Sequence, residues 1–131
     1  EKRLHGKRSI GVGGHINPCD LAEGDLFANA CSRELHEELV LPEMPLQLTP
    51  VGLLNDDTTA VGAVHVGLVY RLDASDIQVA IRETSAMAGD FESLAGLRGL
   101  AAAPESPFET WSNLLLRSGA LDCFKQVAVN A

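Results

Sequence analysis

Residues 13–41 read GGHINPCDLAEGDLFANACSRELHEELVL, and this stretch indicates the fold. After the glycine pair, residues 15–24 favour a loop, because Asn-Pro, Cys-Asp and Glu-Gly pairs are typical of turns. Apolar residues then recur every four positions, at Phe27, Cys31, Leu35 and Leu39. Prolines at positions 42 and 45 end the pattern. The spacing therefore predicts a helix over residues 25–41.

Three carboxylates share one face of this expected helix. Glu34, Glu37 and Glu38 stand at positions i, i+3 and i+4, so their side chains converge. If partly buried, two such charges ~5 Å apart repel by about 3 kcal/mol at an effective dielectric of 20, which favours a bound cation or protonation. Oxygen ligands alone favour Mg²⁺ or Mn²⁺. The alternative is a solvated helix face, on which the same spacing costs only a few tenths of a kcal/mol.

The sequence that precedes the glutamates favours a metal-binding site over a solvated helix face. A short strand ends in Gly13 and Gly14, and a glycine without Cβ lets the backbone approach a ligand closely.

The segment resembles the Nudix box, G-x5-E-x7-R-E-U-x-E-E-x-G-U, in which U is a bulky aliphatic residue. The residues on box positions are Gly14, Arg33, Glu34, Leu35, Glu37, Glu38 and Leu41. Asp25 stands seven residues ahead of Arg33, where the box has its first Glu.

Two departures from the box are visible. Ten residues separate Gly14 from Asp25, where the box has five, and Val40 stands in place of the last Gly. Extra length in a loop costs little free energy. The resemblance implies an α/β fold, a Nudix-like α/β/α sandwich with a mixed β-sheet. Residues 1–131 are then expected to form a single domain that lacks one or more N-terminal strands, since only thirteen residues precede Gly14.

The resemblance also implies a function, metal-dependent hydrolysis of a diphosphate linkage in a nucleoside diphosphate derivative or a related small molecule. The cofactor would be Mg²⁺ or Mn²⁺, bound by Glu34, Glu37, Glu38 and the carbonyl of Gly14. The catalytic residues would be Glu34, Glu37 and Arg33, with Glu34 as the base or as its orienting group. Arg33 would hold the helix geometry through an acidic partner. Asp25 and Gly13 would have a structural role and stabilise the conformation of this segment.

Further candidates lie outside the box. His15 and Asp57 are candidate substrate-binding residues, with an ordinary loop histidine and a plain turn as the alternatives. Nudix enzymes often add one more carboxylate, for which Glu83 and Glu92 are the candidates. An isoprenoid-diphosphate isomerase of the same fold depends on a site cysteine, and Cys19 or Cys31 could serve. A Nudix-like module that binds nucleotides without turnover is the third reading.

The rest of the chain predicts alternating strands and helices. Segments rich in Val, Leu and Ile predict strands over residues 9–13, 46–54, 63–72 and 77–82, with His65 inside the third. Residues 55–59 carry turn chemistry. Residues 91–100 are expected to contain one or two helical turns, and a helix is expected over residues 107–117, with Pro107 in its first turn. Three residues at helical spacing are expected in the core: Phe108, Trp111 and Leu115.

Composition excludes several classes. The 131 residues include 18 Asp or Glu and 10 Lys or Arg, and the net charge of −8 makes a nucleic-acid polymer an unlikely partner. The longest apolar run has ten residues, too few for a membrane span. Three cysteines without a C-x-x-C pair (Cys19, Cys31 and Cys123) favour reduced thiols and a cytoplasmic location. A missing N-terminal strand would leave an open sheet edge that a second copy could cover, giving a homodimer.

Overall fold

The computed structural model describes residues 6–122 and 126–130, so Cys123 lies outside the described residues. Within them, α-helices and short strands are mixed, which confirms the α/β class in its broad sense. The chain divides into two compact units. The α2–α3 unit comprises the described residues of 1–11, 54–67 and 87–131, and the α1 unit comprises residues 12–53 and 68–86.

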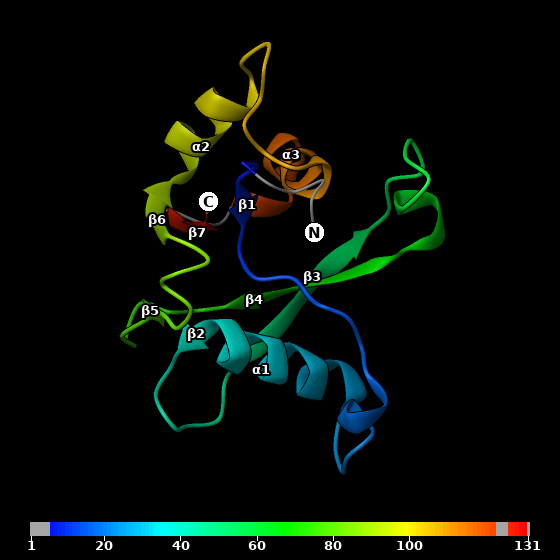
Figure 1. The fold of residues 1–131 in the computed structure, drawn as a ribbon, viewed down its shortest axis with the longest axis vertical. Coiled ribbons are helices and arrows are strands. Elements are labelled where there is room, and N and C mark those ends of the chain that lie inside the picture. The colour runs from blue at the N-terminus through cyan, green and yellow to red at the C-terminus, as the bar shows by residue number, and fades with distance from the viewer. Residues whose placement is uncertain (1–5, 123–125, 131) are drawn as a thin grey trace. The chain divides into compact units, whose positions relative to one another are not determined.

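The α2–α3 unit contains a sheet of three strands in the order β1-β7-β6 (Figure 1), formed by β1 (Ser9–Ile10), β6 (Gly89–Ser93) and β7 (Gln126–Asn130). Both strand pairs are antiparallel, and Ile10 pairs with Val129. The helices are α2 (Leu94–Ala101) and α3 (Thr110–Arg117). Each begins at a side-chain cap, since Ser93 accepts from Gly96 N and Glu109 accepts from Ser112 N.

The hydrophobic core of this unit lies between the two helices and the sheet. Its buried residues are Leu94, Leu97, Ala101, Phe108, Leu116 and Leu121. Ile10, Leu115 and Val129 pack against them. Leu94, Leu97 and Ala101 follow the three- and four-residue spacing that places side chains on one face of a helix. The expected core positions of Phe108 and Leu115 are confirmed.

The α1 unit is built on α1 (Leu26–Glu38). Its strands are β2 (Leu39–Val40), β3 (Leu48–Leu54), β4 (Gly67–Leu72) and β5 (Ala80–Ile81), of which Leu54 and Gly67 fall in the other unit. β2 pairs with β5 in antiparallel register, and β3 pairs with β4 (Figure 1). A turn of 3₁₀-helix, Pro18–Asp20, precedes α1. Among the described residues no helix combines the length and apolar character that crossing a membrane requires.

Several expected boundaries are wrong, each for a local reason. The helix predicted to Leu41 ends at Glu38, because Leu39 and Val40 become extended and pair with Ile81 and Ala80. The helical turns expected within residues 91–100 are confirmed by α2, whereas β6, which precedes it, and its partner β7 are strands that no periodicity indicated. His65 is not in a strand; it follows the 3₁₀-helix Gly62–Val64.

Two further boundaries differ in a smaller way. Pro107 precedes the α3 helix instead of lying in its first turn, because Glu109 provides the N-cap. The strands expected over residues 9–13, 46–54 and 77–82 are shorter, at Ser9–Ile10, Leu48–Leu54 and Ala80–Ile81. The turn expected over residues 55–59 does lie between β3 and β4.

Replacing a leucine of α2 by alanine should lower stability strongly only where that leucine is buried in the core. Leu97 is fully buried, whereas Leu100 on the same helix is 41% exposed. Leu97→Ala is expected to lower the free energy of unfolding by about 2–5 kcal/mol, since it leaves a cavity. Leu100→Ala, which makes the same change in helix propensity, is the matched control and should cost about 1 kcal/mol or less. Urea denaturation measures both, and equal losses would contradict the assigned core.

Candidate functional site

The acidic residues of the box lie in the last turns of α1. The helix begins at Asp25, whose carboxylate accepts a hydrogen bond of 2.8 Å from Ala28 N. Glu34, Glu37 and Glu38 occupy its C-terminal half, at the spacing that places them on one face. Glu37 is exposed, while Glu34 and Glu38 are half-buried.

The guanidinium of Arg33 connects the helix to the preceding loop. Its Nε donates to Asp20 Oδ1 at 2.8 Å, and one terminal nitrogen donates to Asp20 Oδ2 at 3.1 Å. The other terminal nitrogen donates to Oε1 of Glu34 at 2.8 Å and to Oε1 of Glu37 at 3.2 Å. The carbonyl of His15 accepts a further bond of 2.7 Å. One side chain therefore joins three carboxylates and the loop backbone.

This network shifts the pKa of both partners in the buried pair. The hydrogen bonds from Arg33, followed by that from Asn17 N, hold the pKa of Asp20 below its usual range. The bonds to Asp20 and then Glu34 raise the pKa of Arg33. The side chain of Asp20 is only 3% exposed, which is rare for a carboxylate unless it is paired. Asp20 and Arg33 are therefore both charged, and each stabilises the other.

Asp20 is the most buried of the carboxylates that bind Arg33, and Asp25, which the resemblance aligns with the first box Glu, is not among them. Asp25 supports the box differently, as the N-cap of α1. Five residues separate Gly14 from Asp20, which is the box spacing, so the extra length lies between Asp20 and Arg33. The sequence contained this signal, but the seven-residue spacing from Asp25 to Arg33 fits the box equally well.

Gly14 contacts the Glu34 carboxylate directly. A Cβ built on Gly14 would overlap the carboxyl group of Glu34, so a larger residue here would push that side chain aside. The neighbouring His15 N–H donates to Glu34 Oε1 at 3.2 Å. The Gly14 carbonyl accepts no hydrogen bond from a described residue. At Gly13 a Cβ would meet no atom within 4 Å, so no described contact requires glycine there.

Glu38 carries the strongest sign of electrostatic strain. Burial raises its pKa, and the negative charges of Glu34, Glu83 and Glu37 raise it further, in that order. Its carboxylate forms no ion pair or hydrogen bond with a described residue. Glu83 comes from outside the box, just after β5, and is the one of the two extra candidates that lies near Glu38.

Two predicted residues, Asp57 and Glu92, belong to the α2–α3 unit. Asp57 lies exposed in the turn after β3. Glu92 lies on β6, where its Oε1 accepts a 2.7 Å bond from Ser93 N. Residue Asp56, beside Asp57, is buried and accepts bonds from Thr58. Its role is therefore structural within the turn.

The oxygen donors suit a hard divalent cation, although they do not form a ready cage. In residues 6–122 and 126–130, no group of three or more His, Cys, Asp or Glu side chains is arranged to hold a metal ion. Arg33 binds Oε1 of Glu34 and Glu37, and Oε2 of each accepts no hydrogen bond from a described residue. Carboxylate and carbonyl oxygens are the ligands that Mg²⁺ and Mn²⁺ prefer. The oxygen donors are chemically suited to Mg²⁺ or Mn²⁺, and their side chains must move before they can bind one ion together.

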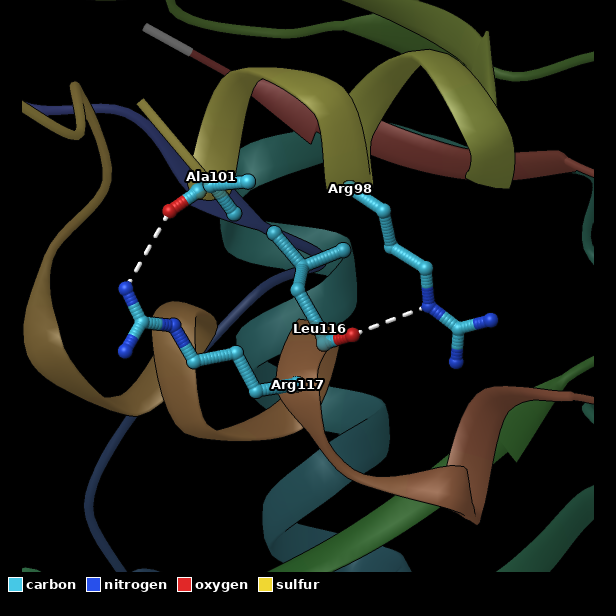
Figure 2. Close-up of a pocket in the computed structure, with 5 residues that line it drawn as sticks. Arg98, Ala101, Leu116 and Arg117 are labelled. Carbon is cyan, nitrogen blue, oxygen red and sulfur yellow. Dashed lines mark hydrogen bonds between the residues drawn. The ribbon is translucent and has the colours of Figure 1, made fainter. Parts of the chain in front are cut away.

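A pocket of about 470 Å³ lies elsewhere, in the α2–α3 unit (Figure 2). Its lining residues are Arg98, Ala101, Ala102, Leu116 and Arg117, none of which was predicted for the site. Arg98 Nε donates to Leu116 O at 2.9 Å, and Arg117 donates to Ala101 O at 3.3 Å. Each arginine thus binds a backbone carbonyl of the other helix, which is a structural role.

Sequence reasoning missed two residues of the site, Asp20 and Arg82. Asp20 could have been found from its spacing to Gly14. Arg82 is exposed, yet its backbone N–H donates to Glu38 O at 2.8 Å and its side chain donates to His36 O and Leu39 O. No local pattern marks it, because its partners lie more than forty positions earlier in the chain.

The Asp20–Arg33 pair predicts a pH-dependent difference in stability. A carboxyl whose folded pKa is lowered stabilises the fold above its unfolded pKa, and this contribution is lost as pH falls through the folded pKa. Asp20→Asn should therefore be less stable than wild type near neutral pH and should approach it in acid. Asp25→Asn is the control, because Asn caps a helix about as well as Asp. Chemical denaturation across pH measures this, and a larger loss in the control would contradict the pairing.

The raised pKa of Glu38 predicts that folding stability changes with pH in the opposite direction. A carboxyl whose folded pKa is raised favours folding below its unfolded pKa, and that contribution is lost as pH rises through the folded pKa. Glu38→Gln should therefore be more stable than metal-free wild type near neutral pH, with the difference vanishing below the usual pKa of a glutamate. Glu37→Gln removes a partner of Arg33 and should bring no such gain. Thermal unfolding with a chelator tests this, and a destabilised Glu38→Gln would refute the strain at this position.

The chain is similar to one curated protein, Protein YmaB of Bacillus subtilis (strain 168). The two are 34% identical over 120 residues, which cover 88% of this chain and 57% of YmaB. The chain thus spans little more than half the length of this relative, whose name states no activity. No family model matches the sequence. No solved structure matches it either.

Proposed function

We propose that this chain carries a Nudix-type hydrolase, which cleaves the diphosphate linkage of a nucleoside diphosphate derivative or a related small molecule with Mg²⁺ or Mn²⁺. The proposal includes the finer fold, an α/β/α sandwich with a mixed sheet. The observation that carries it is the half-buried, unpaired carboxylate of Glu38 among three other glutamates. A fold has no reason to keep such a group unless something else neutralises it, and a divalent cation does.

The residues that would hold the metal are Glu34, Glu37, Glu38 and the Gly14 carbonyl, with Glu83 as a further carboxylate. A bound divalent ion supplies neutralisation of phosphoryl oxygens and a lowered pKa for coordinated water. The chain's own part is to orient the donors. Arg33 and the His15 N–H both bind Oε1 of Glu34, which fixes this carboxylate and directs its second oxygen away from them. Glu34 is thereby the best-oriented residue to accept a proton from water.

Charge supports a small polyanionic substrate that binds together with a cation. The chain has a net charge of −8, so a diphosphate is repelled unless a metal ion screens the carboxylates. The same charge disfavours nucleic-acid polymers. His15 stays a proposed substrate contact because it adjoins Gly14 and Glu34. The proposal also includes a substrate contact from Asp57, a cytoplasmic location and a homodimer.

An isomerase of isoprenoid diphosphates is the second candidate, for one specific reason. Cys19 is exposed and its sulfur lies 3.9 Å from Asp20 Oδ1, in the loop that Arg33 holds. An isomerase that uses this thiol loses activity when the thiol is alkylated. The proposed hydrolase keeps its activity, because none of its roles falls on a cysteine.

The test is a set of diphosphate compounds assayed with Mg²⁺ and with Mn²⁺: nucleoside triphosphates, nucleotide sugars, dinucleotides and coenzymes. Hydrolysis should require the metal, and Glu38→Gln should lower kcat by about 100-fold or more. Glu43→Gln is the control, since Glu43 is exposed in the loop after β2 and outside the box. Ligand-induced stabilisation without product would indicate a binding module instead. Unchanged turnover in folded Glu38→Gln would refute the assignment.

A further inference from the structure

The C-terminus of α1 needs an external partner. The last four carbonyls of a helix lack donors within the helix, and a glycine with positive φ commonly satisfies them. Here Leu39 follows α1 in extended conformation, with φ −119° and ψ 151°. Positive φ occurs among the described residues only at Gly6, Gly11 and Gly24. The N–H of Leu39 still donates to Leu35 O. The helix that bears the glutamates therefore ends without a glycine cap, and the carbonyls after Leu35 depend on donors from elsewhere.

Arg82 supplies the missing donors from another part of the chain. Its backbone N–H donates to Glu38 O at 2.8 Å. Its side chain donates from Nε to His36 O at 2.8 Å and from a terminal nitrogen to Leu39 O at 3.2 Å. This one residue thus satisfies two carbonyls in the last turn of α1 and that of Leu39, the residue after it. The strand pair β2–β5, in which Leu39 pairs with Ile81, brings Arg82 to this position.

Glu38 is the residue most affected by this contact. It is the last residue of α1, where an uncapped helix frays, and its own carbonyl binds the backbone of Arg82. The repulsion from Glu34, Glu83 and Glu37 favours fraying, because an unwound turn would separate the carboxylates. Arg82 opposes this movement through hydrogen bonds at the backbone of the same turn.

We propose that Arg82 is a positioning residue of the site, which holds the last turn of α1 so that Glu38 stays in place to bind the divalent cation. This inference rests on the proposed function. Arg82 does not touch the substrate or the metal in this account. Its effect passes through the helix end, as with residues that orient metal ligands, whose loss typically weakens metal affinity or activity about 10–100-fold.

Arg98 provides a matched control within the same protein. It lies on α2, and its guanidinium donates to Leu116 O and Ser118 O, at the end of α3 (Figure 2 shows the bond to Leu116). Like Arg82, it satisfies carbonyls at a helix C-terminus, and in addition it pairs with Asp122 Oδ1 at 2.6 Å. The helix that Arg98 holds carries none of the box carboxylates. Arg98→Met therefore removes similar hydrogen bonds without touching the proposed site.

The experiment compares Arg82→Met and Arg82→Lys with Arg98→Met. Met keeps most of the apolar stem, and Lys keeps the charge but loses the planar fork that reaches two carbonyls. Mn²⁺ binding without substrate is measured by electron paramagnetic resonance, and activity is measured against Mn²⁺ and substrate concentration. We expect Arg82→Met to bind Mn²⁺ about tenfold or more weakly and to lose kcat at a nearly unchanged KM. Arg82→Lys should recover little, and Arg98→Met should bind Mn²⁺ as wild type does.

Hydrogen exchange, together with Mn²⁺ binding, distinguishes failure of the role of Arg82 from failure of the proposed function. Amides of residues 36–40 should exchange faster in Arg82→Met than in Arg98→Met, and unchanged exchange would overturn the role of Arg82 alone. Equal Mn²⁺ affinity in the two Met variants, with an active wild type, would also overturn that role and leave the proposed function standing. A wild-type protein that neither binds Mn²⁺ nor hydrolyses any diphosphate would overturn the proposed function, and this inference with it. If Arg82→Met does not fold, Arg82→Lys decides the comparison.

Discussion

The site depends on the contact of one guanidinium with three carboxylates. Arg33 binds Asp20, Glu34 and Glu37 and also the carbonyl of His15. A planar guanidinium with five donors can make such contacts at fixed angles, whereas an ammonium cannot. Because Asp20 and His15 belong to the loop and the glutamates to α1, this contact sets how the glycine bend meets the helix. The close approach of Gly14 to Glu34 follows from it.

The same contact leaves the site electrostatically incomplete. Five carboxylates (Asp20, Glu34, Glu37, Glu38 and Glu83) face two arginines, Arg33 and Arg82, so three negative charges are not balanced locally. Arg82 uses its side chain for carbonyls, and Glu38 has no cationic partner among residues 6–122 and 126–130. Buried or half-buried like charges cost free energy, and proteins retain them mostly where a ligand or a reaction requires them. The imbalance thus gives a physical reason for a divalent cation.

Arginines from other segments complete the ends of three helices in this chain. Arg82 satisfies carbonyls at the end of α1, and Arg98 does the same at the end of α3, while Arg117 donates to Ala101 O at the end of α2. All three helices end without a glycine of positive φ. Stability of each helix end is therefore tied to tertiary contacts. In α1 this links the position of the last glutamate to the pairing of β2 with β5.

The sequence by itself determined the helix interior and the convergence of Glu34, Glu37 and Glu38, because both follow from a period that adjacent residues impose. It also determined the core position of Leu115 through the same helical spacing, whereas Phe108 is buried although it precedes α3. Only the tertiary structure decided that Asp20, rather than Asp25, pairs with Arg33, since both aspartates satisfy a spacing rule and differ only in where the loop places them. It alone decided the end of α1, the strand β7 and the proximity of Glu83 to Glu38. Each of these depends on a partner far away in the chain, and non-local contacts leave no periodic mark in a sequence.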